Sequence, residues 1–231
     1  MQSLRRESGL VCAAMQYVSW GLTRSYLSLC HRLSIYGREN LPRSPHYVLV
    51  ANHCSHLDAV SMASAVPWRH RDRVFPIAAG DLFFETPARA FISALGLNAL
   101  PMWRQHCGRH ALGDLRARLL EEDCIYVLFP EGSRSRDGRM ARFKPGLGML
   151  VAGTDVPVVP CHLAGTFNAL PPHRRMPKMD KVTLKIGEPI CFANVANARP
   201  GWEEVGKTLR ESVADLGRAS HCAREAAPAP Y

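Results

Sequence analysis

The sequence predicts an α/β fold in which helices flank a layered, mostly parallel central sheet. Three observations indicate it. Short apolar runs alternate along the chain with segments of helical character. Two of these runs, 47–51 and 124–128, end at polar clusters, and open α/β sheets place their ligands at the carboxyl ends of the strands. A hydrophobic content of 47% over 231 residues suffices for a sizeable core in one compact domain.

The first predicted element is an N-terminal helix. Residues 9–30 are mostly apolar with interspersed aromatic residues, but Arg24 and several serines interrupt the run. The interruptions make it a poor match to a signal peptide or to a spanning helix, which needs about 20 mostly apolar residues. Two interpretations remain: an amphipathic helix in the membrane interface, with Tyr17 and Trp20 at headgroup depth, or an ordinary helix packed on the core.

Strands and helices alternate through the middle of the chain. The apolar run 47–51 predicts a buried strand, and 74–79 predicts a short one. A short helix at 87–95 and a longer helix at 106–121 lead to a third strand at 124–129.

The same alternation continues to the end of the predicted domain. A helix, a strand, a late edge strand and a terminal helix are expected at 146–152, 157–161, 182–186 and 202–216. Residues 168–180 are predicted to form a basic loop. Residues 219–231 are rich in alanine and proline and are predicted to be a disordered tail.

The charge and the cysteines narrow the class of partner. Lysine and arginine number 29 against 20 acidic residues, a net charge of +9, which suits an anionic partner such as a lipid surface or an acidic carrier protein. The basic residues are dispersed and no nucleic-acid-binding motif is present, so nucleic acid is not expected as a partner. The eight cysteines lack framework spacing, which indicates reduced thiols and a cytosolic compartment.

The segment 52–58 carries the strongest chemical signal. It follows the apolar run 47–51 and places His53 and Asp58 five positions apart. On a regular helix five residues turn through about 500°, so the two side chains meet only if the chain turns between them. Ser55, as an N-cap, would supply that turn and place Asp58 in the first helical turn. Asp58 would then orient the His53 ring, leaving the other ring nitrogen to act as a general base.

Two alternatives compete with a catalytic pair. Ser-x-x-Asp is a common helix start, and a histidine near a strand end is often a surface residue. His53, Cys54 and His56 could also bind a metal ion, but no second ligand pair with zinc spacing occurs in the chain, so no metal is expected.

A second polar segment, 129–135, follows the strand predicted at 124–129. Pro130 and Gly132 are typical of the turn that ends a strand, and they place Glu131 at the carboxyl edge of the sheet. Arg134 offers a planar fork that suits a phosphate, and Ser133 offers a hydroxyl donor. The alternative is a local surface ion pair between Glu131 and Arg134.

The two segments together resemble the glycerophospholipid acyltransferases, specifically the bacterial 1-acylglycerol-3-phosphate acyltransferase group. The first matches the Asn-His-x-Ser-x-x-Asp (HX4D) motif and the second the Phe-Pro-Glu-Gly-Ser-Arg-Ser motif. Three further blocks match in order: Leu100–Arg104, Phe143–Gly146 and Val156–Pro160. The likeness spans roughly residues 33 to 190. Met102 and Trp103 depart from the usual second block, which leaves the acceptor's head group open.

The resemblance implies an O-acyltransferase. A fatty acyl group would move from acyl-CoA or acyl-acyl carrier protein to the free hydroxyl of lysophosphatidic acid, with no cofactor and no covalent acyl-enzyme. His53 would be the base and Asp58 its orienting acid. The residues implied in acceptor binding are Arg104, Glu131, Gly132, Ser133 and Arg134. Alternatives are O-acylation of another lysolipid, such as a lyso-ornithine lipid, and a non-catalytic protein that binds membrane surfaces.

The resemblance also implies a domain organisation and a location. Residues 1–32 would form a membrane-interface helix, 33–218 the acyltransferase domain and 219–231 the tail. A lysolipid acceptor lies in a membrane, so the protein is expected on the cytoplasmic side of the cell membrane, peripheral or monotopic.

Overall fold

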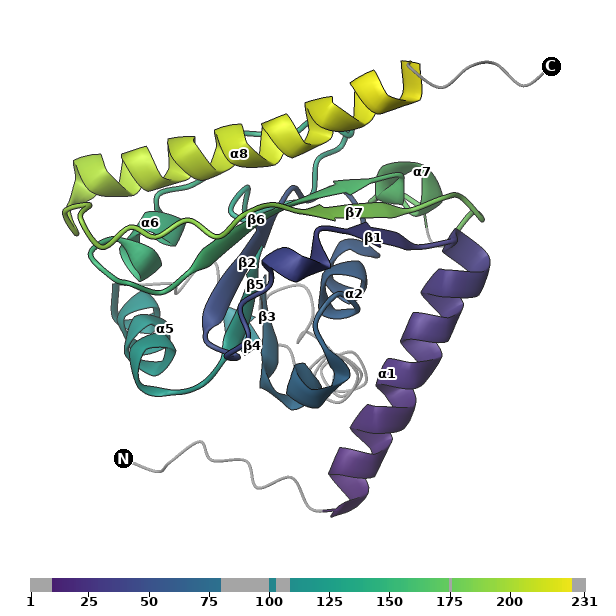
Figure 1. The fold of residues 1–231 in the computed structure, drawn as a ribbon, viewed down its shortest axis with the longest axis horizontal. Helices are drawn as coiled ribbons and strands as arrows, with labels where there is room; N and C mark the ends of the chain where they lie inside the picture. The colour runs from purple at the N-terminus through teal and green to yellow at the C-terminus, as the bar shows by residue number, and fades with distance from the viewer. Residues whose placement is uncertain (1–9, 80–99, 103–108, 175, 226–231) are drawn as a thin grey trace.

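The computed structural model describes residues 10–79, 100–102, 109–174 and 176–225. Within them a seven-stranded sheet runs in the order β1-β7-β6-β2-β5-β3-β4, with helices on both faces (Figure 1). The strands are β1 (Ser34–Tyr36), β2 (Tyr47–Ala51), β3 (Val74–Ala79), β4 (Leu100–Met102), β5 (Ile125–Leu128), β6 (Val158–Ala164) and β7 (Thr183–Ile186). The α-helices are α1 (Leu10–His31), α2 (Asp58–Ala63), α5 (Arg109–Glu121), α6 (Gly146–Val151), α7 (Thr166–Ala169) and α8 (Arg199–Glu225), and the 3-10 helices are η1 (Arg38–Asn40) and η2 (Trp68–Arg73).

Strand β2 lies in the middle of the sheet between β5 and β6, parallel to both. All five of its residues are buried, as expected for a parallel strand covered on both faces. Val50 pairs with Leu128, so β2 and β5 end side by side. The two polar segments predicted to form a site therefore leave the sheet at the same edge.

Alternate residues of the central strands face two separate cores. Val48, Val50 and Tyr126 pack in a cluster with residues of α5, α6 and α8, such as Leu119 and Leu209. On the opposite face, Tyr47, Leu49 and Ile125 pack with Met62 of α2. This period-two alternation produces the expected layered arrangement and confirms the predicted α/β class with a mostly parallel sheet.

The sheet departs from the prediction at β7. This strand runs antiparallel to β6 and is covered on its other side by β1, so it is not an edge strand. The short strands β1 and β4 were not predicted, because three residues are too few to display a period.

Helix α1 confirms the predicted N-terminal helix and lies along one side of the molecule (Figure 1). Its fully buried Leu27 packs with Leu57, Ala169 and Val182, which join it to the segments around α2 and α7. In the part of the chain that the structure describes, no helix is both long enough and apolar enough to cross a membrane.

Helix α8 extends from Arg199 to Glu225 and so continues into the segment predicted to be a disordered tail. Alanine, arginine and glutamate in 218–225 are good helix formers and carry the helix past the predicted end at 216. Residues 226–231 and the predicted helix 87–95 lie outside the described residues. The first three residues of the predicted helix 106–121 do as well.

Candidate active site

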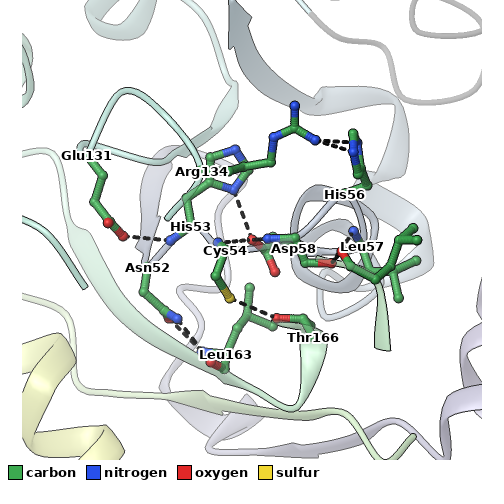
Figure 2. A network of polar contacts seen from close by, with 12 residues as sticks. Asn52, His53, Cys54, His56, Leu57, Asp58, Glu131, Arg134, Leu163 and Thr166 are labelled. Atoms are coloured by element: carbon green, nitrogen blue, oxygen red, sulfur yellow. Dashed lines mark hydrogen bonds and ion pairs between the residues drawn. The ribbon is translucent and has the colours of Figure 1, made fainter. Parts of the chain in front are cut away.

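The turn after β2 is organised around one oxygen atom of Asp58. Its Oδ2 accepts hydrogen bonds from His53 Nδ1 at 2.9 Å and from the backbone N–H groups of Cys54 at 2.7 Å and Ser55 at 2.8 Å (Figure 2). Asp58 is fully buried, whereas the His53 side chain is 20% exposed. The predicted contact between histidine and aspartate is present, and the chain turns between them as expected.

Ser55 plays a different part from the predicted N-cap. Helix α2 begins at Asp58 with Leu57 before it, so Ser55 lies in the preceding turn. The Ser55 hydroxyl accepts the Leu57 N–H at 3.1 Å and donates to the Leu170 carbonyl at 2.7 Å. The turn is thereby tied to the segment after α7 while Asp58 keeps its predicted place in the first helical turn.

The loop after β5 holds His53 from the other side. The His53 N–H donates to Glu131 Oε1 at 2.7 Å, and the His53 carbonyl accepts from the Ser135 N–H at 2.8 Å. The imidazole stacks on the Phe129 ring with a centroid distance of 4.2 Å. With Nδ1 bound to Asp58, Nε2 is the ring nitrogen that can take a proton from a substrate.

Glu131 is buried, and each of its carboxylate oxygens accepts a hydrogen bond from a backbone N–H group. Oε1 accepts from His53 and Oε2 accepts from the Ala141 N–H at 2.8 Å. Burial raises the pKa of Glu131, and the two backbone N–H groups oppose that shift. These contacts connect β2 to the loop after β5 and indicate a positioning role, whereas the sequence motif implied contact with the acceptor.

Cationic side chains gather beside this loop. Arg134 Nη1 contacts the imidazole ring of His56 (Figure 2). Gly132 has a φ of 74°, and a Cβ at that position would lie 2.5 Å from Lys144 Nζ. The Lys144 side chain therefore crosses Gly132. Two cationic side chains from this region favour binding of an anionic group.

Cys54 and Asn52 have structural contacts. The Cys54 thiol lies 3.3 Å from Thr166 Oγ1, and burial followed by the charge of Asp58 raises its pKa to about 12. This thiol is protonated at neutral pH and is a poor nucleophile. The Asn52 amide bonds both the carbonyl and the N–H of Leu163, at 3.0 and 2.8 Å, which ties the end of β2 to β6.

Residues of the two predicted polar segments lie together in the structure. It brings together His53, Asp58, Glu131 and Arg134, and Ser133 is exposed on the same loop. Arg104 lies outside the described residues. Among the described residues, no three histidine, cysteine or acidic side chains converge in a way that could hold a metal ion.

The contacts of Asn52, His56 and Lys144 were not predicted from the sequence. The available signal was their position inside the matching motifs, since Asn52 opens the first motif and Lys144 lies in the block Phe143–Gly146. Their partners lie 78 residues away for His56 and 111 residues away for Asn52. Spacing along the chain does not reveal such contacts.

Comparisons with known proteins agree with this geometry. The model of a protein family described as Acyltransferase matches residues 32–164. The mouse protein "1-acyl-sn-glycerol-3-phosphate acyltransferase alpha" is 30% identical over 129 residues, which cover 56% of this chain and 44% of the mouse protein. The Arabidopsis thaliana "1-acyl-sn-glycerol-3-phosphate acyltransferase LPAT1, chloroplastic" is 32% identical over 147 residues, 61% of this chain and 38% of that protein. The chain thus matches less than half the length of these curated relatives.

A solved structure shares the fold over nearly the whole chain. It is the 1-acyl-sn-glycerophosphate (LPA) acyltransferase PlsC from Thermotoga maritima, with a TM-score of 0.68 and 24% sequence identity. The match covers 98% of this chain and 86% of the other. The arrangement of sheet and helices is therefore one that an experimental structure also shows.

Proposed function

Because the chain belongs to the Acyltransferase family, we propose that it moves a fatty acyl group onto the free hydroxyl of lysophosphatidic acid, giving phosphatidic acid. The acyl donor in this proposal is acyl-CoA or acyl-acyl carrier protein. The contact between His53 Nδ1 and Asp58 Oδ2 carries the proposal, because it supplies an oriented general base at a partly exposed position.

In the proposed reaction His53 and Asp58 act as a pair. Asp58 fixes the tautomer in which Nδ1 carries hydrogen, so Nε2 accepts the proton of the acceptor hydroxyl. The acceptor oxygen attacks the thioester carbonyl, an ester bond forms, and the carbon–sulfur bond breaks. The departing thiolate takes the proton from His53. The thioester is already activated, so a positioned base suffices without a covalent enzyme intermediate.

The acceptor's phosphate is proposed to bind beside the loop after β5. Arg134 offers a planar set of donors, Ser133 a hydroxyl, and Gly132 a backbone without a side chain. Arg104 is proposed to contact the same phosphate on the strength of its motif. Glu131 is proposed to hold His53 in place through the backbone bonds described above.

Helix α1 is proposed to lie on the membrane that holds the lysolipid. The outward face of α1 exposes large apolar side chains: Leu22 is 67% exposed and Leu29 is 80% exposed, with Val18 on the same face. The ring of Tyr17 lies 6.5 Å from that of the exposed Trp68 in η2, beside the guanidinium of Arg71. Exposed apolar residues bordered by aromatic and basic side chains suit the interface of an anionic membrane.

The test is an acyl-transfer assay in liposomes with purified protein. Long-chain acyl-CoA or acyl-acyl carrier protein is the donor, and lysophosphatidic acid or lyso-ornithine lipid is the acceptor. The variants are His53→Ala and Asp58→Asn, with Asp155→Asn as an exposed carboxylate control. We expect His53→Ala to lose activity by about 10²–10⁴-fold, the usual contribution of a general base, with unchanged binding to liposomes.

Each outcome distinguishes the proposals. Product from lysophosphatidic acid that is absent with His53→Ala supports the proposed reaction. Product from lyso-ornithine lipid alone keeps the mechanism and changes the acceptor. Equal activity in wild type and His53→Ala refutes the role of His53. If no acceptor is acylated although liposome binding is intact, the protein is a membrane-surface binding protein.

A further inference from the structure

His56 connects two loops beside the candidate active site. Arg134, in the loop after β5, places Nη1 against the imidazole ring of His56, where one ring nitrogen can accept its hydrogen bond. The backbone of Pro172, in the segment after α7, lies near enough to the ring to raise the pKa of His56. Figure 2 shows the Arg134 guanidinium directed at His56, close to the pair formed by His53 and Asp58. The exposed imidazole therefore lies between the guanidinium and the segment after α7.

The contact with Arg134 matches the neutral form of the imidazole. A neutral ring has one nitrogen that can accept a hydrogen bond from a guanidinium. A protonated ring has two donors and no acceptor, so it cannot accept from Arg134 and its charge repels the guanidinium. The neutral form of His56 therefore fits the contact with Arg134 better than the protonated form does.

The charged surroundings also favour the neutral form. Partial burial of the ring and then the positive charge of Arg134 lower the pKa of His56. Among the remaining groups that face it, the Pro172 carbonyl raises the pKa, His53 lowers it and Asp58 raises it. The ring is consequently neutral near pH 7 and gains its proton only in more acidic solution.

We propose that neutral His56 is a positioning residue that holds Arg134 beside the acyl-transfer site, so that protonation of His56 weakens binding of a phosphate-bearing acceptor. This inference rests on the proposed function, which assigns Arg134 to the acceptor's phosphate. It adds a residue that makes the affinity for the acceptor depend on pH. In the sequence, His56 lies between His53 and Asp58, but it takes no part in the contact between them.

The first experiment measures the contact and needs no substrate. The ring of His56 is titrated by NMR in wild type and in Arg134→Gln, and its signals are identified by their absence from His56→Gln. The Arg134→Gln variant lacks the guanidinium that donates to the neutral ring, and it lacks the positive charge that disfavours a protonated ring. We therefore expect the pKa of His56 to rise in this variant. An unchanged pKa would refute the contact, whatever reaction the protein catalyses.

The second experiment measures KM and kcat for lysophosphatidic acid in wild type, His56→Gln and His56→Ala from about pH 5 to 8. Titration of the acceptor's own phosphate affects all three proteins equally, so the ratio between wild type and variant isolates His56. We expect His56→Ala to raise KM about tenfold at neutral pH with a smaller change in kcat, as for loss of one charge-assisted hydrogen bond. His56→Gln keeps an acceptor oxygen and should restore most of the affinity.

The pH dependence separates positioning from direct binding. We expect the KM of wild type to rise relative to that of His56→Gln as the pH falls, because glutamine does not titrate. Equal KM in wild type and His56→Ala would refute the positioning role. A wild-type KM that falls relative to His56→Gln in acid would also refute it, because protonated His56 would then bind the phosphate itself. Failure of wild type to acylate lysophosphatidic acid would refute the proposed function, and the NMR titration would still decide the contact.

Discussion

At the scale of single residues, the site depends on carboxylates that organise backbone. Asp58 Oδ2 accepts from two backbone N–H groups as well as from the His53 ring, so the oxygen that fixes the orientation of the ring also holds the turn. Glu131 likewise accepts hydrogen bonds from two backbone N–H groups, those of His53 and Ala141, and so holds together the two loops that meet at His53. Both residues are buried, where a backbone N–H that loses its partner is costly.

Replacement of Glu131 tests this arrangement. Glu131→Gln retains one acceptor oxygen, so either His53 or Ala141 loses its partner and meets an amide NH2 group instead. We expect the free energy of unfolding to fall by about 1–3 kcal/mol, with a lower kcat because the backbone of His53 shifts. Chemical unfolding and steady-state assays measure the two effects. Glu188→Gln removes an exposed carboxylate and is the matched control. Unchanged stability and kcat in Glu131→Gln would contradict the positioning role.

At the scale of elements, α1 presents two faces with different tasks. Leu27 is fully buried against α2 and the segment around α7, whereas Leu22 and Leu29 are exposed. The inner face fastens the helix beside the turn that carries Asp58, since Leu57 belongs to the same cluster. The outer face, with Leu22 and Leu29, points away from this cluster.

Substitutions on the two faces should have opposite effects. Leu22→Gln with Leu29→Gln should weaken binding to anionic vesicles by at least about tenfold with unchanged thermal stability, because full burial of each leucine contributes about 1.5–3 kcal/mol. Ser25→Gln lies on the same face and removes no apolar area, so it serves as the control. Leu27→Ala should instead lower the free energy of unfolding by about 2–5 kcal/mol. Vesicle sedimentation and thermal unfolding give the two measurements, and unchanged vesicle binding in the double variant would refute the membrane face.

The contact between α6 and α8 depends on a single glycine. A Cβ on Gly148 would lie 2.3 Å from the Cα of Trp202, so the two helix backbones approach closely at this point. A Cβ on Gly146, two residues earlier, would meet only the end of the Leu112 side chain at 3.8 Å. The same chemical change at these two positions therefore isolates the effect of the close approach.

Gly148→Ala should destabilise the protein although alanine is the better helix former. The gain in helix propensity is about 1 kcal/mol, whereas separation of two packed backbones costs about 1–3 kcal/mol or more. Gly146→Ala should be neutral or slightly stabilising. Denaturant unfolding of both variants measures the difference, and equal stability would show that the helices separate at no cost.

At the scale of the whole molecule, stability should depend on pH through histidines that fold in the neutral form. Burial and then the charge of Lys185 lower the pKa of His162, and its Nδ1 is buried without a hydrogen-bond partner. The pKa of His56 is lowered as well. A histidine whose pKa is lower in the folded state than in the unfolded state binds a proton more readily when the chain is unfolded. The free energy of unfolding therefore decreases as the pH falls below about 6.5, the ordinary pKa of histidine.

His162→Leu tests this prediction. We expect the free energy of unfolding of wild type to decline between pH 7 and 5, with a slope of at most about 1.4 kcal/mol per pH unit for each histidine. The variant should show a shallower slope over the same range. Parallel curves for the two proteins would show that His162 does not contribute.

The sequence by itself determined the α/β class, the buried strand β2, and the pair His53 and Asp58. These features depend on residues that are close together in the chain, such as the continuous apolar run 47–51 and the turn that follows it. Local patterns record local geometry, so both could be predicted without a structure.

Only the tertiary structure decided how distant segments meet. It placed β1 beside β7, which makes β7 an internal strand, and it turned Glu131 toward the backbone of His53. It also brought Arg134 to His56 and left Leu22 and Leu29 exposed on α1. Each of these contacts joins segments far apart in the chain or depends on which face of an element is covered. Residue spacing predicts neither the long-range contacts nor the covered faces. The partner of a polar group, and the element that covers an apolar face, are selected by packing of the complete fold.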